Sequence, residues 1–232
     1  MARLLVHVEG ITERQFVNTI LNPHLLSCGY QWVSARLMGN ALQNKQRGGV
    51  SSWQLTRRDL LAHLKNDPQA VATTMVDYYG LPDSGNAAWP GKKAAVHLPF
   101  PQKAASVEAA LLADLQQGMG KNFDPRRFVP YVMMHEFESL LFSDCRRFAE
   151  IIGQPQLTDS FQIIRNQFST PEEINDSPTT APSKRILDLV PNYRKPLLGN
   201  RAIIEIGLDK IRAECPHFNG WIERLEERAQ IL

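Results

Sequence analysis

The sequence of 232 residues lacks the features that define several classes of protein. Its three cysteines, Cys28, Cys145 and Cys215, are too few and too far apart for a disulfide framework. We therefore expect reduced thiols in the core of a cytoplasmic protein. No apolar run approaches the roughly 18 residues of a membrane span, and the N-terminal residues lack the pattern of a signal peptide. These absences predict a cytoplasmic protein without membrane association.

An excess of charge of one sign is also missing. Lysine and arginine number 26 against 24 aspartates and glutamates, which gives a net charge of +2. This balance excludes a strongly basic, histone-like binder but allows a local basic groove. The sequence contains no GxxxxGK[ST], GxGxxG or GxSxG motif, so neither a nucleotide-binding loop nor a serine-hydrolase elbow is predicted.

The order of the hydrophobic patterns predicts an α/β fold. Strand-like runs occupy residues 3–8, 31–38, 70–77 and 128–135. Helical spacings of three and four separate these runs, and from residue 136 onward the pattern is helical almost throughout. The alternation favours a mainly parallel, Rossmann-like sheet of four strands flanked by helices. We expect this α/β domain to cover residues 1–145, with a helical C-terminal region, residues 146–232, packed on it.

Capping residues indicate where several helices should begin. Thr12 with Gln15 three positions later has the form of a capping box. Ser52, or Ser51 beside it, precedes a helical pattern and is expected to be its N-cap. Asp144 is expected to cap a helix in the C-terminal region.

Acidic residues stand where the predicted strands end. Glu9 follows the first strand, Asp77 ends the third, and Glu136 follows the fourth, with Glu138 just beyond. Glu13 lies in the first turn of the helix after Glu9. The carboxyl ends of parallel strands meet at one edge of a sheet, and clustered carboxylates repel each other unless a cation lies between them. Oxygen ligands suit Mg2+ or Mn2+, so this pattern predicts a site for metal-assisted phosphoryl transfer with one or two ions.

Each of these acids also has an ordinary structural explanation. Asp77 would cap its loop, and Glu13 would complement the dipole of its helix. Glu138 would be a helix cap or a member of an ion pair. The coincidence of acids at three strand ends favours the metal site over these separate roles.

The motif VEGITERQF resembles the first motif of Toprim domains, which occur in topoisomerases, primases and overcoming-lysogenization-defect (OLD) nucleases. The second Toprim motif is a strand ending in Asp-x-Asp. Here AVATTMVDYYG supplies Asp77, but Tyr79 stands at the position of the second aspartate. The motifs VEGITE, VDYYGLP, HEFESLLFSD and PSKR, in this order, resemble a family of Toprim-like bacterial proteins, domain of unknown function 4276. Its members are often encoded beside ATPases, which implies a role in anti-phage defence.

The resemblance implies roles for particular residues. Glu9 would be the metal-associated general acid or base, with Glu13 and Asp77 as metal ligands. Glu136 and Glu138 would bind a second metal or shape the pocket. In PSKR, Lys184 would neutralise the scissile phosphate, with Arg185 as the less favoured alternative; a solvated first helical turn is the structural alternative for Lys184.

Two loops carry basic residues that are suited to a nucleic-acid strand. The loop after Asp77 is rich in proline and glycine and carries one aromatic residue and several lysines: Trp89, Lys92, Lys93 and Lys103. An earlier loop and the segment after it add further cations: Lys45, Arg47, Arg57 and Arg58. Basic groups beside an aromatic ring favour a strand-binding groove, although ordinary solvated loops have the same composition.

The histidines are interpreted structurally rather than as ligands. His7, inside the first strand, and His135, at the end of the fourth, are each expected to be buried and hydrogen-bonded. The remaining four show no recognised metal spacing: His24, His63, His97 and His217.

Taken together, these patterns predict a Mg2+-dependent Toprim-like nuclease that acts on DNA or RNA, with an ATPase partner in anti-phage defence. The helical region would hold a partner, a second copy in a homodimer, or the nucleic acid. The alternative is a non-catalytic adaptor of an ATPase complex that keeps the fold but not the second aspartate. A phosphatase acting on small phosphates is a third, weaker alternative.

Overall fold

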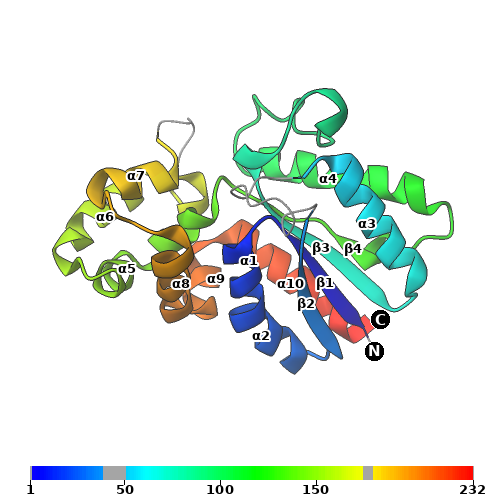
Figure 1. Cartoon of the computed structure of the whole chain (residues 1–232), viewed down its shortest axis with the longest axis horizontal. Helices are drawn as coiled ribbons and strands as arrows, with labels where there is room; N and C mark the ends of the chain where they lie inside the picture. The colour runs from blue at the N-terminus through cyan, green and yellow to red at the C-terminus, as the bar shows by residue number, and fades with distance from the viewer. Residues whose placement is uncertain (1, 39–50, 175–179, 232) are drawn as a thin grey trace. The chain divides into compact units, whose positions relative to one another are not determined.

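The computed structural model describes residues 2–38, 51–174 and 180–231. The expected basic loop that contains Lys45 and Arg47 lies outside these ranges. The described chain packs as two compact units, Met1–Val132 with Trp221–Leu232, and Met133–Gly220 (Figure 1). The expected domain boundary at residue 145 stays a prediction, and it differs from this division in residues 133–145 and 221–232.

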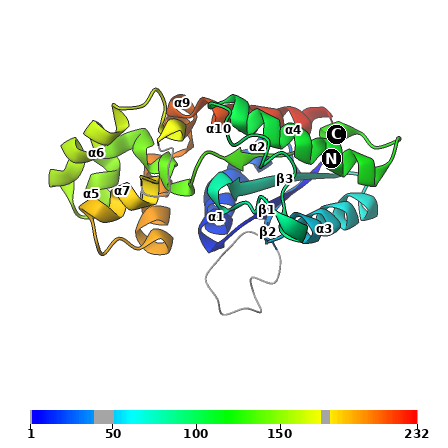
Figure 2. The same cartoon turned by 90° about the horizontal axis from the view of Figure 1, so that it is seen from above.

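The first unit is built on a mainly parallel sheet with the strand order β2-β1-β3-β4. Its strands are β1 (Arg3–Val8), β2 (Trp32–Leu37), β3 (Ala70–Asp77), β4 (Phe128–Val129) and β5 (Val132–Met133), which also pairs with β3. In Figure 2, β3, β1 and β2 follow one another in this order. The expected α/β fold class, a parallel sheet flanked by helices with a helical C-terminal region, is confirmed.

Both central strands are buried along nearly their whole length, as the continuous apolar runs predicted. Two threonines interrupt the apolar run of β3, and both are satisfied by hydrogen bonds. Thr74 Oγ1 donates to the carbonyl of Tyr131 at 3.0 Å, and the indole of Trp221 donates to Thr73 Oγ1 at 2.8 Å. Trp221 also stacks on Tyr131, with ring centroids 4.3 Å apart, so the last helix is anchored in the core of the sheet unit.

The helices of the first unit connect these strands. They are α1 (Ile11–Phe16), continued by a π-helical turn (Val17–Leu21) into α2 (Asn22–Ser27), and then α3 (Trp53–Asn66) and α4 (Gln102–Met119). The final helix, α10 (Pro216–Ile231), starts in the second unit and contributes its later turns to the first. Because parallel crossovers are right-handed, the β1-to-β2 helices and the β2-to-β3 helix cover opposite faces of the sheet. Figure 1 shows α1 and α2 on one side of the strands and α3 on the other.

The expected N-caps have different outcomes in this unit. Ser52 is the N-cap of α3, and its hydroxyl accepts the backbone N–H of Leu55 at 3.4 Å, so that prediction is confirmed. The capping box of Thr12 and Gln15 is wrong, because α1 already begins at Ile11 with Gly10 as N-cap. Gly10 has no side chain to cap the helix, and the absence of a Cβ atom leaves space for the side chain of a neighbouring residue.

The second unit is helical. It contains a 3-10 helix (Phe137–Asp144) and the helices α5 (Cys145–Ile151), α6 (Thr158–Arg165), α7 (Pro182–Leu189), α8 (Asn200–Ile206) and α9 (Leu208–Glu214). Asp144 caps α5 by accepting the backbone N–H of Arg147 at 2.8 Å, as predicted. The rings of Phe148 and Phe161 lie 4.7 Å apart in its core. Among the described residues, no helix of either unit is both long and apolar enough to span a bilayer.

The expected long fourth strand is wrong in extent. The segment forms two short strands, β4 and β5, on either side of Pro130 and Tyr131. Proline has no N–H to donate to a neighbouring strand, so the ladder is interrupted at this point.

Candidate functional site

Two of the predicted acids lie at adjoining strand ends in the first unit. β1 and β3 are parallel neighbours, with Val8 in register with Met75, so Glu9 follows β1 where Asp77 completes β3. The backbone N–H of Asp77 donates to Glu9 Oε2 at 3.4 Å. The sheet therefore places these two residues at adjoining strand ends, with the Glu9 carboxylate close to the backbone of Asp77.

These strand ends also lie at the topological switch point of the sheet. The chain leaves β1 toward β2 on one side and leaves β3 toward β4 on the other. The connections after β1 and β3 consequently run to opposite faces of the sheet. Ligands of open α/β sheets bind at such a switch point.

Glu13 approaches the same strand end from the first turn of α1. It is only 4% exposed. A Cβ atom added to Gly10 would lie 2.8 Å from Glu13 Oε2, closer than real Cβ contacts allow. The backbone of Gly10 is extended, so a side chain there would be opposed by the position of the Glu13 carboxylate rather than by backbone conformation. Gly10 therefore makes room for the Glu13 carboxylate where it lies in this structure.

The residue after Asp77 lies close to two cationic side chains. Tyr78 and Tyr79 form a 3-10 turn (Tyr78–Gly80), and the Nζ of Lys92 lies 3.2 Å from the centroid of the Tyr78 ring and donates to its carbonyl at 2.5 Å. The Nζ of Lys103 lies 5.4 Å from the same ring. Burial lowers the pKa of Lys92 to about 8, with the charge of Lys103 acting in the same direction. Two buried lysines, Lys92 in the loop and Lys103 in the first turn of α4, thus lie beside Tyr78.

The aromatic residue of this loop is not available to a nucleic acid base. Trp89 is 2% exposed, its ring lies 5.1 Å from that of Trp53, and its indole N–H donates to the carbonyl of Ser51 at 2.9 Å. Lys93 is exposed, whereas Lys92 and Lys103 are buried. Of the groove residues predicted for this segment, Trp89, Lys92 and Lys103 are therefore buried, and only Lys93 faces solvent.

The remaining predicted site residues belong to the second unit. Glu136 Oε2 accepts the backbone N–H of Ser183 at 3.0 Å in the first turn of α7, where Lys184 is exposed. Glu138 is 1% exposed and forms an ion pair with Lys195 at 3.0 Å. Burial raises the pKa of Glu138, and the nearby ammonium of Lys195 opposes that rise. Both acids thus have partners within their own unit, and their roles as metal ligands stay predictions.

The strand-end acids have the ligand chemistry of a hard divalent cation, but their carboxylate oxygens do not all lie within 4.8 Å of one another in this structure. Carboxylate oxygens of Glu9, Glu13 and Asp77 are the ligand type that Mg2+ and Mn2+ prefer, and Mg2+ is usually held by one or two carboxylates together with water and phosphate oxygens. The space that Gly10 leaves for the Glu13 carboxylate is consistent with a site built to hold its side chain.

A different cluster was missed by the sequence analysis. Among the described residues, the group of three side chains with the spacing of metal ligands is His24, Cys28 and Glu226. His24 was interpreted as lacking a metal spacing because histidines were compared only with histidines, and cysteines only with cysteines. The signal was present, since His24 and Cys28 are four residues apart and lie on one face of a helical segment.

Comparisons with known proteins bear on the identity of the whole chain. Neither curated proteins nor solved structures gave a match. The family model described as domain of unknown function 4276 matches residues 8–226, from the end of β1 into the last turns of α10. This range contains all of the strand-end acids and the cluster on α2 and α10. The chain belongs to the DUF4276 family.

Proposed function

We propose that this protein is a Mg2+-dependent Toprim-like nuclease that cleaves DNA or RNA. One observation carries the proposal: Glu9 and Asp77 are neighbours at the ends of β1 and β3, with the Asp77 N–H 3.4 Å from Glu9 Oε2, at the switch point of the sheet. A carboxylate near a buried strand end is costly unless a partner or a ligand compensates its charge, and a bound cation would do so.

The proposal assigns roles to the residues of this chain. Glu9, Glu13 and Asp77 would hold Mg2+ or Mn2+, and Glu9 would in addition transfer a proton as general acid or base. A bound ion supplies charge neutralisation and activates water for phosphodiester hydrolysis. Lys184, exposed in the first turn of α7, would offset the charge of the scissile phosphate. Glu136 and Glu138 are weaker candidates for a second ion, because each has a partner in its own unit.

The Toprim relationship, an ATPase partner in anti-phage defence, a homodimer and a cytoplasmic location complete this proposal. They are supported by the resemblance of the four motifs. The specific observation against catalysis is Tyr79, which occupies the position of the second Toprim aspartate. It favours the second candidate function, a non-catalytic adaptor of an ATPase complex.

The test uses the full chain with single- and double-stranded DNA and RNA, with and without Mg2+ or Mn2+. We expect metal-dependent cleavage that falls at least about 1,000-fold in Glu9→Gln and in Asp77→Asn, equivalent to about 4 kcal/mol in the transition state. Glu227→Gln is the matched control, since Glu227 is an exposed acid of α10 and should cut like the wild type. Melting temperatures that stay near the wild-type value would show that the variants are folded.

Metal binding separates nuclease from adaptor. Calorimetric titration of Mg2+ and Mn2+ should give binding that Glu9→Gln weakens. Absence of binding at millimolar metal, together with absence of cleavage, supports the adaptor. Hydrolysis of a small phosphoester by a protein that is inert on every nucleic acid would instead favour a phosphatase.

A further inference from the structure

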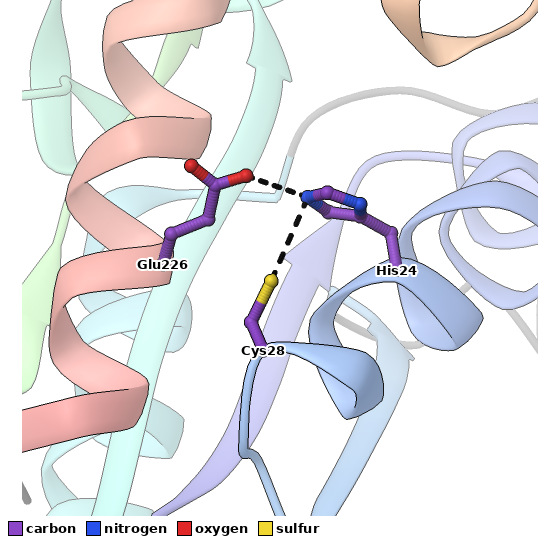
Figure 3. Close-up of side chains that lie close together, drawn as sticks. All are labelled: His24, Cys28 and Glu226. Carbon is purple, nitrogen blue, oxygen red and sulfur yellow. Dashed lines mark hydrogen bonds and ion pairs between the residues drawn. The ribbon is translucent and has the colours of Figure 1, made fainter.

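The cluster of His24, Cys28 and Glu226 joins two segments of the first unit that are distant in the sequence. His24 lies on α2, Cys28 is the C-cap residue of that helix, and Glu226 lies on α10. His24 Nε2 is 2.6 Å from Glu226 Oε1 and 3.8 Å from Cys28 Sγ. Figure 3 shows the three side chains pointing toward one another from these two elements.

An ion pair alone does not require this arrangement. A hydrogen bond between His24 and Glu226 needs only two residues, yet the thiol of Cys28 is also turned toward the imidazole. Imidazole nitrogen, thiolate sulfur and carboxylate oxygen are the three ligand types of zinc sites. Sulfur and nitrogen favour a borderline-soft ion over Mg2+, so this cluster differs in chemistry from the acids at the strand ends.

The distances allow an ion to enter with a small adjustment. Bond lengths of about 2.3 Å to sulfur and 2.0 to 2.2 Å to nitrogen and oxygen place the ligand atoms of a tetrahedral zinc site about 3.4 to 3.6 Å apart. The observed separation of 3.8 Å between Sγ and Nε2 fits this geometry. The Nε2 to Oε1 separation of 2.6 Å is that of a hydrogen bond, so the carboxylate must withdraw by about 0.8 Å. The side chain of Glu226 is 25% exposed, so solvent borders it.

The backbones that carry the three residues are held close together. Tyr30, two residues after Cys28, is buried and donates its hydroxyl to the carbonyl of Leu225 at 2.9 Å. Between them, Gly29 has a φ of +117°, and a Cβ there would lie 3.6 Å from the carbonyl oxygen of Ala229. Contacts on both sides of the cluster therefore fix α10 against the end of α2, which reduces the reorganisation that metal binding requires.

We propose that His24, Cys28 and Glu226 form a binding site for Zn2+, or a similar borderline transition-metal ion, that links α2 to α10. Three protein ligands leave a fourth position for water. The site links residues 202 positions apart in the sequence, so an ion bound there would stabilise the return of the C-terminal helix to the sheet unit. The proposed zinc site does not depend on nuclease activity, and its test is independent of the strand-end acids.

The experiment is a titration of the full, reduced chain with Co2+ as a spectroscopic substitute for Zn2+, after removal of metal with a chelator. We expect one equivalent to bind with a thiolate-to-cobalt charge-transfer band in the near ultraviolet. Zn2+ should displace the cobalt and raise the melting temperature by several degrees. Cys28→Ser should lose the band, and His24→Ala and Glu226→Gln should each weaken binding at least tenfold.

Two controls make the result specific. Cys145→Ser removes a different thiol, whose burial raises its pKa to about 12, and should leave the band unchanged. Glu9→Gln with Asp77→Asn should also leave it unchanged, because those residues lie outside the cluster. Circular dichroism confirms the fold of each variant. The proposal is overturned if Co2+ does not bind at micromolar concentration, or if Cys28→Ser keeps both the band and the affinity.

Discussion

The acids of the helical unit and the acids at the strand ends of the sheet unit have different surroundings. In the helical unit, Glu138 pairs with Lys195 at 3.0 Å, and the buried Glu172 accepts two backbone N–H groups in the first turn of α10, each at 2.9 Å. In the sheet unit, Glu9 and Asp77 instead stand side by side at the ends of two parallel strands. The first pattern uses acids to satisfy cations and helix ends, and the second brings two acids to adjoining strand ends.

This difference separates acids that stabilise a fold from acids that are suited to chemistry. A carboxylate that caps a helix or neutralises a lysine lowers the energy of the folded state. Neighbouring carboxylates raise it unless a cation joins them. We therefore expect substitutions in the helical unit to change stability first, and substitutions at the strand ends to change metal binding and cleavage first.

The largest effect on stability is expected from Lys195→Met. The change leaves the carboxylate of Glu138, whose side chain is 2% exposed, without this positive charge, and breaking a buried ion pair costs about 3 kcal/mol. Because burial raises the pKa of Glu138 in the folded state, the ionised form is the unfavourable one. The loss should therefore be full above that pKa and shrink as the pH falls through it. Chemical denaturation at pH 7 and pH 4 measures both values.

A double variant supplies the control for that prediction. Lys195→Met combined with Glu138→Gln removes both charges and should recover most of the loss at pH 7. Equal stability of Lys195→Met and the wild type at pH 7 would contradict the role of the ion pair, and the contrast between the units would weaken.

The next effect concerns activity rather than stability. In Gly10→Ala the new methyl group would push the Glu13 carboxylate from its place, since 2.8 Å separates them. The end of a glutamate side chain moves readily, so we expect less than about 0.5 kcal/mol in stability. Metal-dependent cleavage should fall about tenfold, or about 1.4 kcal/mol. Kinetic assays at varied Mg2+ measure the loss.

Gly220→Ala is the matched substitution, because no heavy atom lies within 4 Å of the added Cβ on α10. It should stabilise the helix by about 0.5 to 1 kcal/mol without altering cleavage. If Gly10→Ala cuts as well as Gly220→Ala does, Glu13 is not part of the metal site.

The sequence predicted the sheet well because its signals are local. Continuous apolar runs identified β1 and β3, and a serine before a helical pattern identified the start of α3. Parallel pairing then follows from the alternation of strands and helices, and it brings Glu9 next to Asp77. The failures are also local: Thr12 matched a capping box, but the helix has its N-cap two residues earlier, at Gly10, which accommodates Glu13.

Contacts between distant segments could not be predicted in the same way. Nothing in the spacing of residues links Glu138 to Lys195, or Glu226 to the pair His24 and Cys28. These contacts arise from helix packing, which depends on how whole faces fit together. Trp89 illustrates the same limit. A tryptophan among lysines suggested a surface on which a base could stack, but Trp89 packs against Trp53 in the core.

A smaller effect is expected where an acid of the helical unit caps a helix. Asp144→Ala removes the acceptor for the Arg147 N–H and should cost about 1 kcal/mol of stability. Asp144→Asn keeps an acceptor and should lose much less. Cleavage at low temperature should match the wild type in both. If Asp144→Ala loses cleavage at unchanged stability, the helical unit also contains an acid that is needed for activity. That result would contradict the proposed difference between the acids of the helical unit and those at the strand ends.

The smallest effect tests a buried cation of the sheet unit. The folded-state pKa of Lys92, about 8, lies below its ordinary value of 10.5, so the ionised amine opposes folding at neutral pH. As the pH rises from 7 to 8.5, the free energy of unfolding of the wild type should increase by about 0.5 kcal/mol relative to that of Lys92→Met, after allowance for partial solvent screening. The exposed neighbour provides the control, because Lys93→Met should show no such trend. If the difference in stability between the wild type and Lys92→Met stays constant over this range, Lys92 remains charged beside Tyr78. The sheet unit would then hold a stable positive charge against the residue that follows Asp77.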